Sequence, residues 1–462
     1  MIIMEGLPTE YDVIVIGTGM VESILAAAFA RCGKSVLHLD TQTVTTNTEE
    51  VAEEPKKSVV TADDLLKQSR KYNIDLAPKL YYSTGGIIDL LIQSNVGKYC
   101  EFKLVSRLLR EKNEQLETVP CSRADVFNTN EINLMEKRLL MKVLTLCLNY
   151  DKKKDELKDE LETPFIDFLK KQKLDDNLSR LILTSIAIVD NQATTTECQR
   201  NLLFTSFFNY QGLVGAKRFL NSIGRYGNSP FLYPLYGTGE MSQCFCRCTG
   251  IVTESSDHYR SKHVICNKAF LMNYLDKSNT KVVKRTVLFT NRSIKSSVKE
   301  EITFLRLNNS NEQGITVIEA GNTSGCAPED LYDFTRENIL GQFTYDQIDT
   351  YNMNMTEQQE IPNLFLTHGP DATIHFDQVI DTAKNIFSIV CQNGEEFLPR
   401  APDPDDIIIE SESTENNSIT KFDDESKNDD TNVVQEHLDE TIIKNETQMF
   451  LYYISIIIFR FI

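Results

Sequence analysis

The sequence predicts a multi-layer α/β fold that starts with a Rossmann-type βαβ unit and carries an inserted helical subdomain. Residues 13–16 form a continuous apolar strand that runs into a glycine turn, and a helix and a second strand follow before Asp40. Farther along, apolar residues recur at helical spacing through much of 129–224. Continuous apolar strands are typical of buried parallel sheets, and a glycine turn after the first strand is typical of dinucleotide-binding units.

The dinucleotide motif in this first unit is incomplete. Gly17 and Gly19 supply the tight turn, but Glu22 stands where G-x-G-x-x-G requires its third glycine. That glycine permits close helix packing beside a pyrophosphate held at the helix N-terminus. A carboxylate crowds this packing and repels phosphate, so we expect a flavoprotein-like fold without a cofactor. The alternative is a flavin-dependent oxidoreductase that binds its dinucleotide through Gly17, Gly19 and Asp40.

The chain divides into four regions by composition. The helical region contains the strongest amphipathic pattern, over 132–149, whose spacing places on one face Ile132, Met135, Leu139, Leu140, Val143, Leu144 and Cys147. From 401 onward the chain is acidic and low in apolar residues, which favours disorder. The predicted regions are 1–128 (first part of the α/β domain, with a polar insert at 41–62), 129–224 (helical subdomain), 225–400 (remainder of the α/β domain) and 401–462 (acidic disordered tail with a short apolar terminus).

The apolar terminus, 449–462, contrasts with the acidic tail before it. A membrane-spanning helix needs about 20 apolar residues, and this run is shorter and contains Arg460. Two interpretations remain, a marginal membrane contact and a terminus altered by splicing or gene prediction. The second is favoured.

Overall composition restricts the class of partner and the compartment. The 462 residues carry a net charge of -19, which argues against nucleic acid because phosphate binding needs basic patches. The 11 cysteines are scattered, and no secretory signal opens the chain. We therefore expect a cytosolic protein with reduced thiols.

No motif nominates a catalytic residue or a metal site. Cys244, Cys246 and Cys248 lie two apart, whereas zinc sites use C-x₂-C pairs with a second pair elsewhere. Alternate residues of a strand share one face, so this run predicts a buried cysteine stripe in a strand. The histidines show no metal or triad spacing, and no nucleophile elbow or Walker loop is present.

Four segments together resemble the Rab escort proteins, which belong to the same family as the Rab GDP-dissociation inhibitors. They are DVIVIGTGMVES (12–23), KYNIDLAPKLYYSTGGIIDLLIQSNVGKYCEFK (71–103), VPCSRADVFNTNEINLMEKRLLMK (119–142) and GRYGNSPFLYPLYGTGEMSQCFCR (224–247). The resemblance implies a flavoprotein-like fold without flavin. It also implies a non-catalytic function, in which the protein binds GDP-bound Rab GTPases and presents them to the Rab geranylgeranyltransferase heterodimer. The escort then shields the geranylgeranyl groups and reaches membranes transiently.

The resemblance also implies which residues contact each partner. Phe127 and Arg138 match family positions that contact the prenyltransferase, and Glu240 and Arg247 match contributors to the Rab platform, with Tyr236 beside them. From the residues alone, Phe127 could instead be a hydrophobic staple against the helix that follows. Arg138 could be a solvated helix residue, Glu240 and Arg247 could form an internal ion pair, and Tyr236 could be core.

The chain departs from the family pattern at two places that bear on the Rab platform. After the second strand the family usually shows a YYGG segment, and this chain has TQTVTTNTEE at 41–50. After Arg247 an apolar, glycine-containing strand is replaced by TGIVTESSDHYR. These departures imply an incomplete Rab platform. Separately, a GDP-dissociation inhibitor that recycles prenylated Rabs without contacting the transferase is a second alternative.

Overall fold

The computed structural model describes residues 8–40, 72–129, 132–153, 157, 163–188, 205–246, 259–276, 281–290, 293–295, 302–308, 314–327, 339–355, 361–391, 394–400 and 452–460. The predicted βαβ unit is confirmed: strand β1 (Glu10–Ile16) leads into helix α1 (Met20–Arg31), and β2 (Val36–Leu39) pairs with β1 in parallel. The insert at 41–62 lies outside the described residues.

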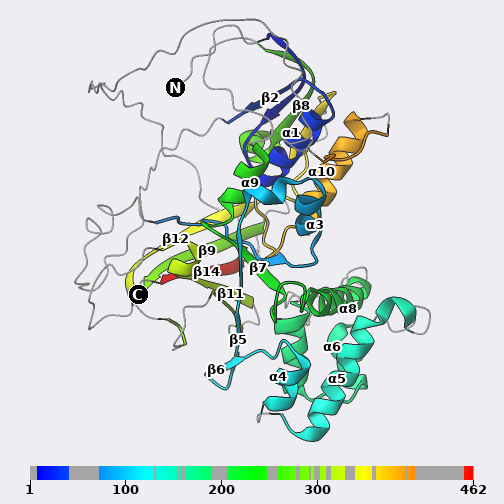
Figure 1. Ribbon diagram of the computed structural model, residues 1–462, viewed down its shortest axis with the longest axis vertical. Helices are drawn as coiled ribbons and strands as arrows, with labels where there is room; N and C mark the ends of the chain where they lie inside the picture. Colours follow the sequence, from blue (N-terminus) through cyan, green and yellow to red (C-terminus); the bar gives the residue numbers. More distant parts are fainter. Residues whose placement is uncertain are drawn as a thin grey trace, which may run out of the picture. The chain divides into compact units, whose positions relative to one another are not determined.

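The first sheet is parallel throughout, in the order β13-β8-β1-β2, with β8 at Arg260–Asn267 and β13 at Leu364–Thr367. Around α1 lie α9 (Gly239–Cys246) and α10 (Asp377–Val390), with α3 (Gly86–Gln93) beside α10 (Figure 1). Every residue of α1 from Met20 to Phe29 is buried. A helix that is covered on all sides needs small and apolar residues all round, as its alanine run provides.

Two further sheets extend the α/β frame. A small sheet has the order β3-β7-β4, formed by Tyr81–Tyr82, Phe231–Pro234 and Phe102–Leu104. A larger mixed sheet has the order β12-β9-β14-β11-β10-β5-β6. Its strands are β12 (Ile339–Asp349), β9 (Lys281–Thr290), β14 (Tyr452–Arg460), β11 (Gly314–Ala320), β10 (Thr303–Asn308), β5 (Arg107–Lys112) and β6 (Gln115–Thr118).

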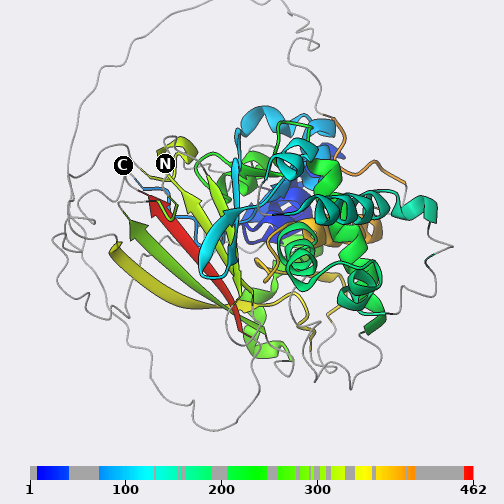
Figure 2. The same cartoon turned by 90° about the horizontal axis from the view of Figure 1, so that it is seen from below.

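The apolar C-terminal run lies inside this sheet, a position that neither sequence interpretation included. Strand β14 pairs in parallel with β9 on one side and with β11 on the other, and Figure 2 shows it running between them. Continuous apolar runs are typical of strands with two neighbours. The C-terminal run is thus a structural strand of the α/β frame.

Helices gather on one side of the larger sheet, as predicted for the inserted region (Figure 1). They are α4 (Arg123–Asn128), α5 (Leu134–Leu148), α6 (Phe165–Lys171), α7 (Asp176–Arg180), the π-helix η5 (Leu181–Ile186) and α8 (Thr205–Ser222). Their core is continuous with sheet residues such as Leu108 and Phe304. The boundaries of the four regions stay predictions. Within the described residues, no helix is both long and apolar enough to cross a bilayer.

Candidate functional site

The turn between β1 and α1 has dinucleotide-binding geometry, but its residues do not fit a phosphate. Gly17 has φ +110°, which only glycine adopts easily. Glu22 is fully buried and folds back onto the turn, so that a Cβ added at Gly19 would lie 2.4 Å from Glu22 Oε2. Thr18 donates its hydroxyl hydrogen bond to Asp40, the residue a ribose would otherwise engage. This arrangement disfavours the flavin-dependent alternative.

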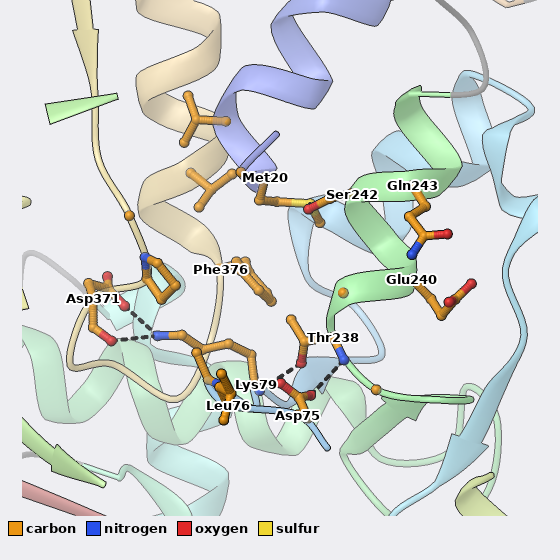
Figure 3. A pocket seen from close by; sticks show the side chains of 18 of the residues that line it. Met20, Asp75, Leu76, Lys79, Thr238, Glu240, Ser242, Gln243, Asp371 and Phe376 are labelled. Atoms are coloured by element: carbon orange, nitrogen blue, oxygen red, sulfur yellow. Dashed lines mark hydrogen bonds and ion pairs between the residues drawn. The ribbon is translucent and has the colours of Figure 1, made fainter. Parts of the chain in front are cut away.

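A cavity of about 580 Å³ opens beside this turn (Figure 3). Its lining comes from the start of α1, residues 72–79, the turn and first part of α9 at 236–243, Asn267 at the end of β8, and residues 368–379. Tyr236 and Glu240, both expected at the Rab platform, lie on its wall. The structure therefore brings these two predicted residues together with the incomplete dinucleotide turn.

Buried charged groups hold the floor of the cavity in place. Lys79 is 1% exposed, and its Nζ donates to the Asp371 side chain at 2.5 Å, to the Asp371 carbonyl at 2.9 Å and to the Thr373 carbonyl (Figure 3). Burial acts to raise the pKa of Asp371, but the attraction and hydrogen bond of Lys79 outweigh it and hold that pKa below its usual range. The ion pair thus joins residues 79 and 371 of two distant segments.

Asp75 anchors the opposite side of the same floor. Its Oδ2 accepts from the Thr238 backbone N–H at 2.6 Å and from the Tyr233 hydroxyl at 3.3 Å. Burial raises the pKa of Asp75, and the hydrogen bonds from Thr238 and Ala77 oppose that rise. Asp75 therefore fixes the turn that precedes α9.

Tyr236 has a strained backbone and an exposed ring. Its φ is +67°, a left-handed conformation that is uncommon for a bulky residue, and its side chain is 52% exposed. The backbone is held by a hydrogen bond from Tyr236 N to the Ser324 carbonyl at 2.8 Å, and the ring covers Gly325 so closely that a Cβ there would lie 2.5 Å from it. Strain of this kind is found preferentially at functional sites. The core alternative for Tyr236 is wrong.

Glu240 lies in the first turn of α9 and is partly exposed. Among the described residues its carboxylate forms no ion pair, while Arg247, its expected companion, lies outside them. An acidic side chain near a helix N-terminus is stabilised by the helix dipole. Glu240 is therefore available to a partner without a compensating internal cation in the described part of the chain.

The cysteine run in α9 corrects the sequence prediction of a strand. Cys244 and Cys246 are both buried, but on a helix, because α9 is covered on more than one side. Cys244 Sγ donates to the Tyr99 carbonyl at 3.1 Å, and Cys246 Sγ lies 3.3 Å from Ser23 Oγ on α1. Cys248 lies outside the described residues. The part of the chain that the structure describes holds no cluster of three potential metal ligands.

Phe127 and Arg138 lie on the helical region, at its exposed surface. Phe127, near the end of α4, is 55% exposed, which disagrees with a buried staple. Lys137 Nζ donates to the carbonyls of Phe127 at 2.7 Å and Thr129 at 2.6 Å, and so fastens the end of α4 to α5. Arg138 follows on α5 and is exposed. The two predicted residues therefore lie on joined helices.

Two more exposed apolar residues adjoin Arg138 on α5. Leu134 is 61% exposed and Met135 is 69% exposed. Residues three and four apart share a helix face, so both lie next to Arg138. The prediction that Met135 belongs to the core was wrong, because α5 is buried from Leu140 onward and its first turn extends beyond the core. Phe127, Leu134, Met135 and Arg138 are called the helical patch below.

A second cavity, of about 260 Å³, opens between helices of the helical region. Its lining comes from α4, α5, η5 and α8 and is largely apolar, including Val126, Leu144, Ile186 and Phe219. Apolar cavities with few polar groups favour apolar ligands. The sequence predicted an apolar helical region but gave no signal for this cavity.

Comparison with known proteins agrees with this architecture. The sequence model of the GDP dissociation inhibitor family matches residues 7–256. The human Rab proteins geranylgeranyltransferase component A 1 is 32% identical, with 83% of this chain and 68% of that protein aligned. The Drosophila melanogaster component A is 28% identical over 88% of this chain and 94% of that protein. The chain spans about two thirds of the length of the mammalian relatives that it matches.

A solved structure shows the same fold. Rab GDI from Plasmodium falciparum superposes with a TM-score of 0.63 at 18% identity, over 85% of this chain and all of that one. The sequence resemblance and the α/β fold are therefore both confirmed. The chain belongs to the GDP dissociation inhibitor family and is similar, over most of its length, to the Rab geranylgeranyltransferase component A (Rab escort) proteins.

Proposed function

We propose that this chain is a non-catalytic Rab escort component. It binds newly made, GDP-bound Rab GTPases, presents them to Rab geranylgeranyltransferase, shields the attached geranylgeranyl groups and delivers the Rab to membranes. The similarity to component A proteins from human and Drosophila over most of the chain supports this function. A protein with this cycle works in the cytosol and contacts membranes only transiently.

The wall of the larger cavity is the proposed Rab-binding surface. Tyr236 presents a half-exposed ring, Glu240 presents a carboxylate that forms no ion pair with the described residues, and Asp75 holds the turn that carries both. Aromatic anchors beside charged groups are typical of interface hot spots. Arg247, outside the described residues, completes the set that the family resemblance assigns to Rab.

The apolar cavity in the helical region is the proposed shelter for geranylgeranyl. Each CH₂ group of a lipid chain that leaves water contributes about 0.8 kcal/mol, so an attached prenyl chain needs an apolar site while the Rab is in solution. Helices α4, α5 and α8 supply such a lining. Two of these helices, α4 and α5, also carry the helical patch, so the lipid shelter and the transferase surface are neighbours in this proposal.

The helical patch is the single observation that favours an escort over an inhibitor that only recycles Rabs. Phe127 on α4 and Leu134 and Met135 on the joined helix α5 all expose apolar side chains, and Arg138 is exposed on the same turns of α5 as the last two. A group of large exposed apolar side chains marks an interaction surface, and an aromatic residue with an arginine supplies typical anchors.

Alanine substitution of the patch tests the assignment. We expect Phe127→Ala and Arg138→Ala each to weaken binding to Rab geranylgeranyltransferase by roughly 2 kcal/mol, the scale of an interface hot spot. Isothermal titration with the purified transferase measures the affinity. Binding of GDP-loaded Rab should stay unchanged, because the Rab surface lies on other elements.

Ile92→Ala and Arg180→Ala are matched controls, since both residues are exposed on helices outside the patch. They should leave transferase affinity as it is. Unchanged transferase binding in both patch variants would contradict the escort function and favour the recycling inhibitor.

A further inference from the structure

Glu22 occupies the place beside the glycine turn that a cofactor phosphate takes in dinucleotide-binding folds. It is the third residue of α1, and it is fully buried. Its Oε2 faces Gly19, and its Cγ would lie 3.6 Å from a Cβ added at Gly17. The side chain thus covers the turn from inside and fills the space in front of the helix N-terminus.

The carboxyl of Glu22 connects three elements at one edge of the first sheet. Its Oε1 accepts from Asn267 Nδ2 at 2.6 Å and from the hydroxyl of Thr367. Asn267 ends β8 and Thr367 ends β13, so a single oxygen joins α1 to two parallel strands. Ligands of open α/β sheets normally bind at this carboxyl edge.

The surroundings of Glu22 favour its neutral form. Oε2 is buried and has no hydrogen-bond partner among the described residues. The charged group that acts on the pKa of Glu22 is Asp40, directly after β2. The other titratable neighbours are Cys266 on β8 and, across the turn, His38 on β2, whose pKa burial lowers. Burial raises the pKa of Glu22, against the hydrogen bonds from Thr367 and Asn267, and Asp40 raises it further. An unpaired buried carboxylate is costly.

The beginning of α1 also contacts α9, the helix that carries Glu240. Ser242 Oγ donates to Met20 Sδ at 3.8 Å, and Ser23 Oγ lies 3.3 Å from Cys246 Sγ. Met20 and Val21 line the larger cavity together with Ser242 and Gln243. The position of α1 therefore sets one wall of the cavity.

We propose that Glu22 is a built-in replacement for the cofactor phosphate: its carboxyl ties α1 to β8 and β13 and thereby positions α9 for the partner. The link from α1 to β8 and β13 follows from the hydrogen bonds of Glu22 in this chain. Only the effect of that link on Rab binding rests on the proposed function. Glu22 is a positioning residue in this proposal and touches no ligand.

Glutamine at position 22 keeps the acceptor oxygen and the shape but cannot ionise. As pH rises from 5 to 8, the wild-type chain should lose thermal stability relative to Glu22→Gln. The sign follows from linkage: a raised folded-state pKa gives stability that is complete below the unfolded pKa, near 4.3, and is lost as pH rises through the folded value. If the unfolding midpoints of the wild type and Glu22→Gln differ by the same amount at every pH from 5 to 8, the proposal is overturned.

The effect of Glu22 on partner binding is measured with a GDP-loaded Rab as the probe. Glu22→Gln should bind it like the wild type, whereas Glu22→Ala, which removes the tie, should bind at least tenfold more weakly. If Glu22→Ala does not fold, Thr367→Val removes one donor at nearly constant volume and should weaken binding several-fold, with Thr286→Val on β9 as the control. If Glu22→Gln, Thr367→Val and the wild type bind Rab with equal affinity, Glu22 does not position α9 for the partner.

Addition of flavin adenine dinucleotide tests the replacement directly. The unfolding midpoint of the wild-type chain should not change, because Glu22 already fills the phosphate position, and a raised midpoint would overturn the proposal. If wild-type chain fails to bind Rab at all, the proposed function fails instead. The pH and dinucleotide measurements still decide the role of Glu22 in that case.

Discussion

Tyr236 and Lys79 line the same cavity but differ in what they contribute. Tyr236 exposes half of its ring from a strained backbone, whereas Lys79 is buried and fully bonded by Asp371 and Thr373. Tyr236 is therefore suited to contact a partner, whereas Lys79 stabilises the wall of the cavity. A contact residue and a structural residue are distinguished by measuring, for each variant, both the free energy of unfolding and the affinity for Rab.

Replacement of Lys79 by methionine should destabilise the protein by about 3–5 kcal/mol, because Asp371 then remains buried without its cation. Chemical denaturation monitored by circular dichroism measures the loss. Lys262→Met is the matched control: that lysine pairs with Asp12 at 2.7 Å but is 74% exposed, and exposed pairs contribute little. Equal stability of Lys79→Met and Lys262→Met would show that the buried pair does not hold the cavity floor.

The local sequence predicted Glu22 as an obstacle to a phosphate but not its bonding. Its two hydrogen-bond donors lie 245 and 345 residues farther along the chain. Similarly, the sequence suggested Asp40 as a ribose ligand, while the structure shows it accepting from Thr18. Residue types reveal the missing glycine, but contacts between distant segments depend on the folded sheet.

At the scale of elements, periodicity predicted the βαβ unit and α5 correctly and misjudged α9. Cys244 and Cys246 suggested a strand because both were expected to be buried. On a helix, residues two apart point in different directions, and both are buried only because η2 (Val96–Tyr99) and α1 pack on different sides of α9. The pattern of one segment cannot reveal how many neighbours cover it.

Strand β14 carries the clearest prediction at this scale. Deletion of 451–462 removes the strand between β9 and β11, so both lose their parallel partner and expose unpaired backbone groups. We expect lower thermal stability and faster hydrogen exchange in 281–290 and 314–320, measured by mass spectrometry.

An equally long deletion within 401–450 is the control and should leave exchange in both strands unchanged. Identical exchange in the two deletion variants would contradict a structural role for β14. The outcome also separates a strand of the fold from a terminal appendage, which the sequence could not do.

The whole molecule combines two features. The α/β frame has a dinucleotide turn that the Glu22 side chain fills, and the helical region carries an open apolar cavity. The first feature was predictable from one residue, Glu22. The cavities were not, because each is lined by segments that lie far apart in the sequence. The departures from the family pattern at 41–50 and after Arg247 lie mainly outside the described residues, so Rab binding has to be measured.

The most direct test of the escort function is geranylgeranyl transfer to a GDP-loaded Rab by purified Rab geranylgeranyltransferase, with and without this chain. We predict transfer only when the chain is present, and reduced transfer at limiting Rab with the Tyr236→Ala variant, because its exposed ring belongs to the proposed Rab surface. A chain that binds both partners yet supports no transfer, or one that leaves the rate at its background level, would contradict the account.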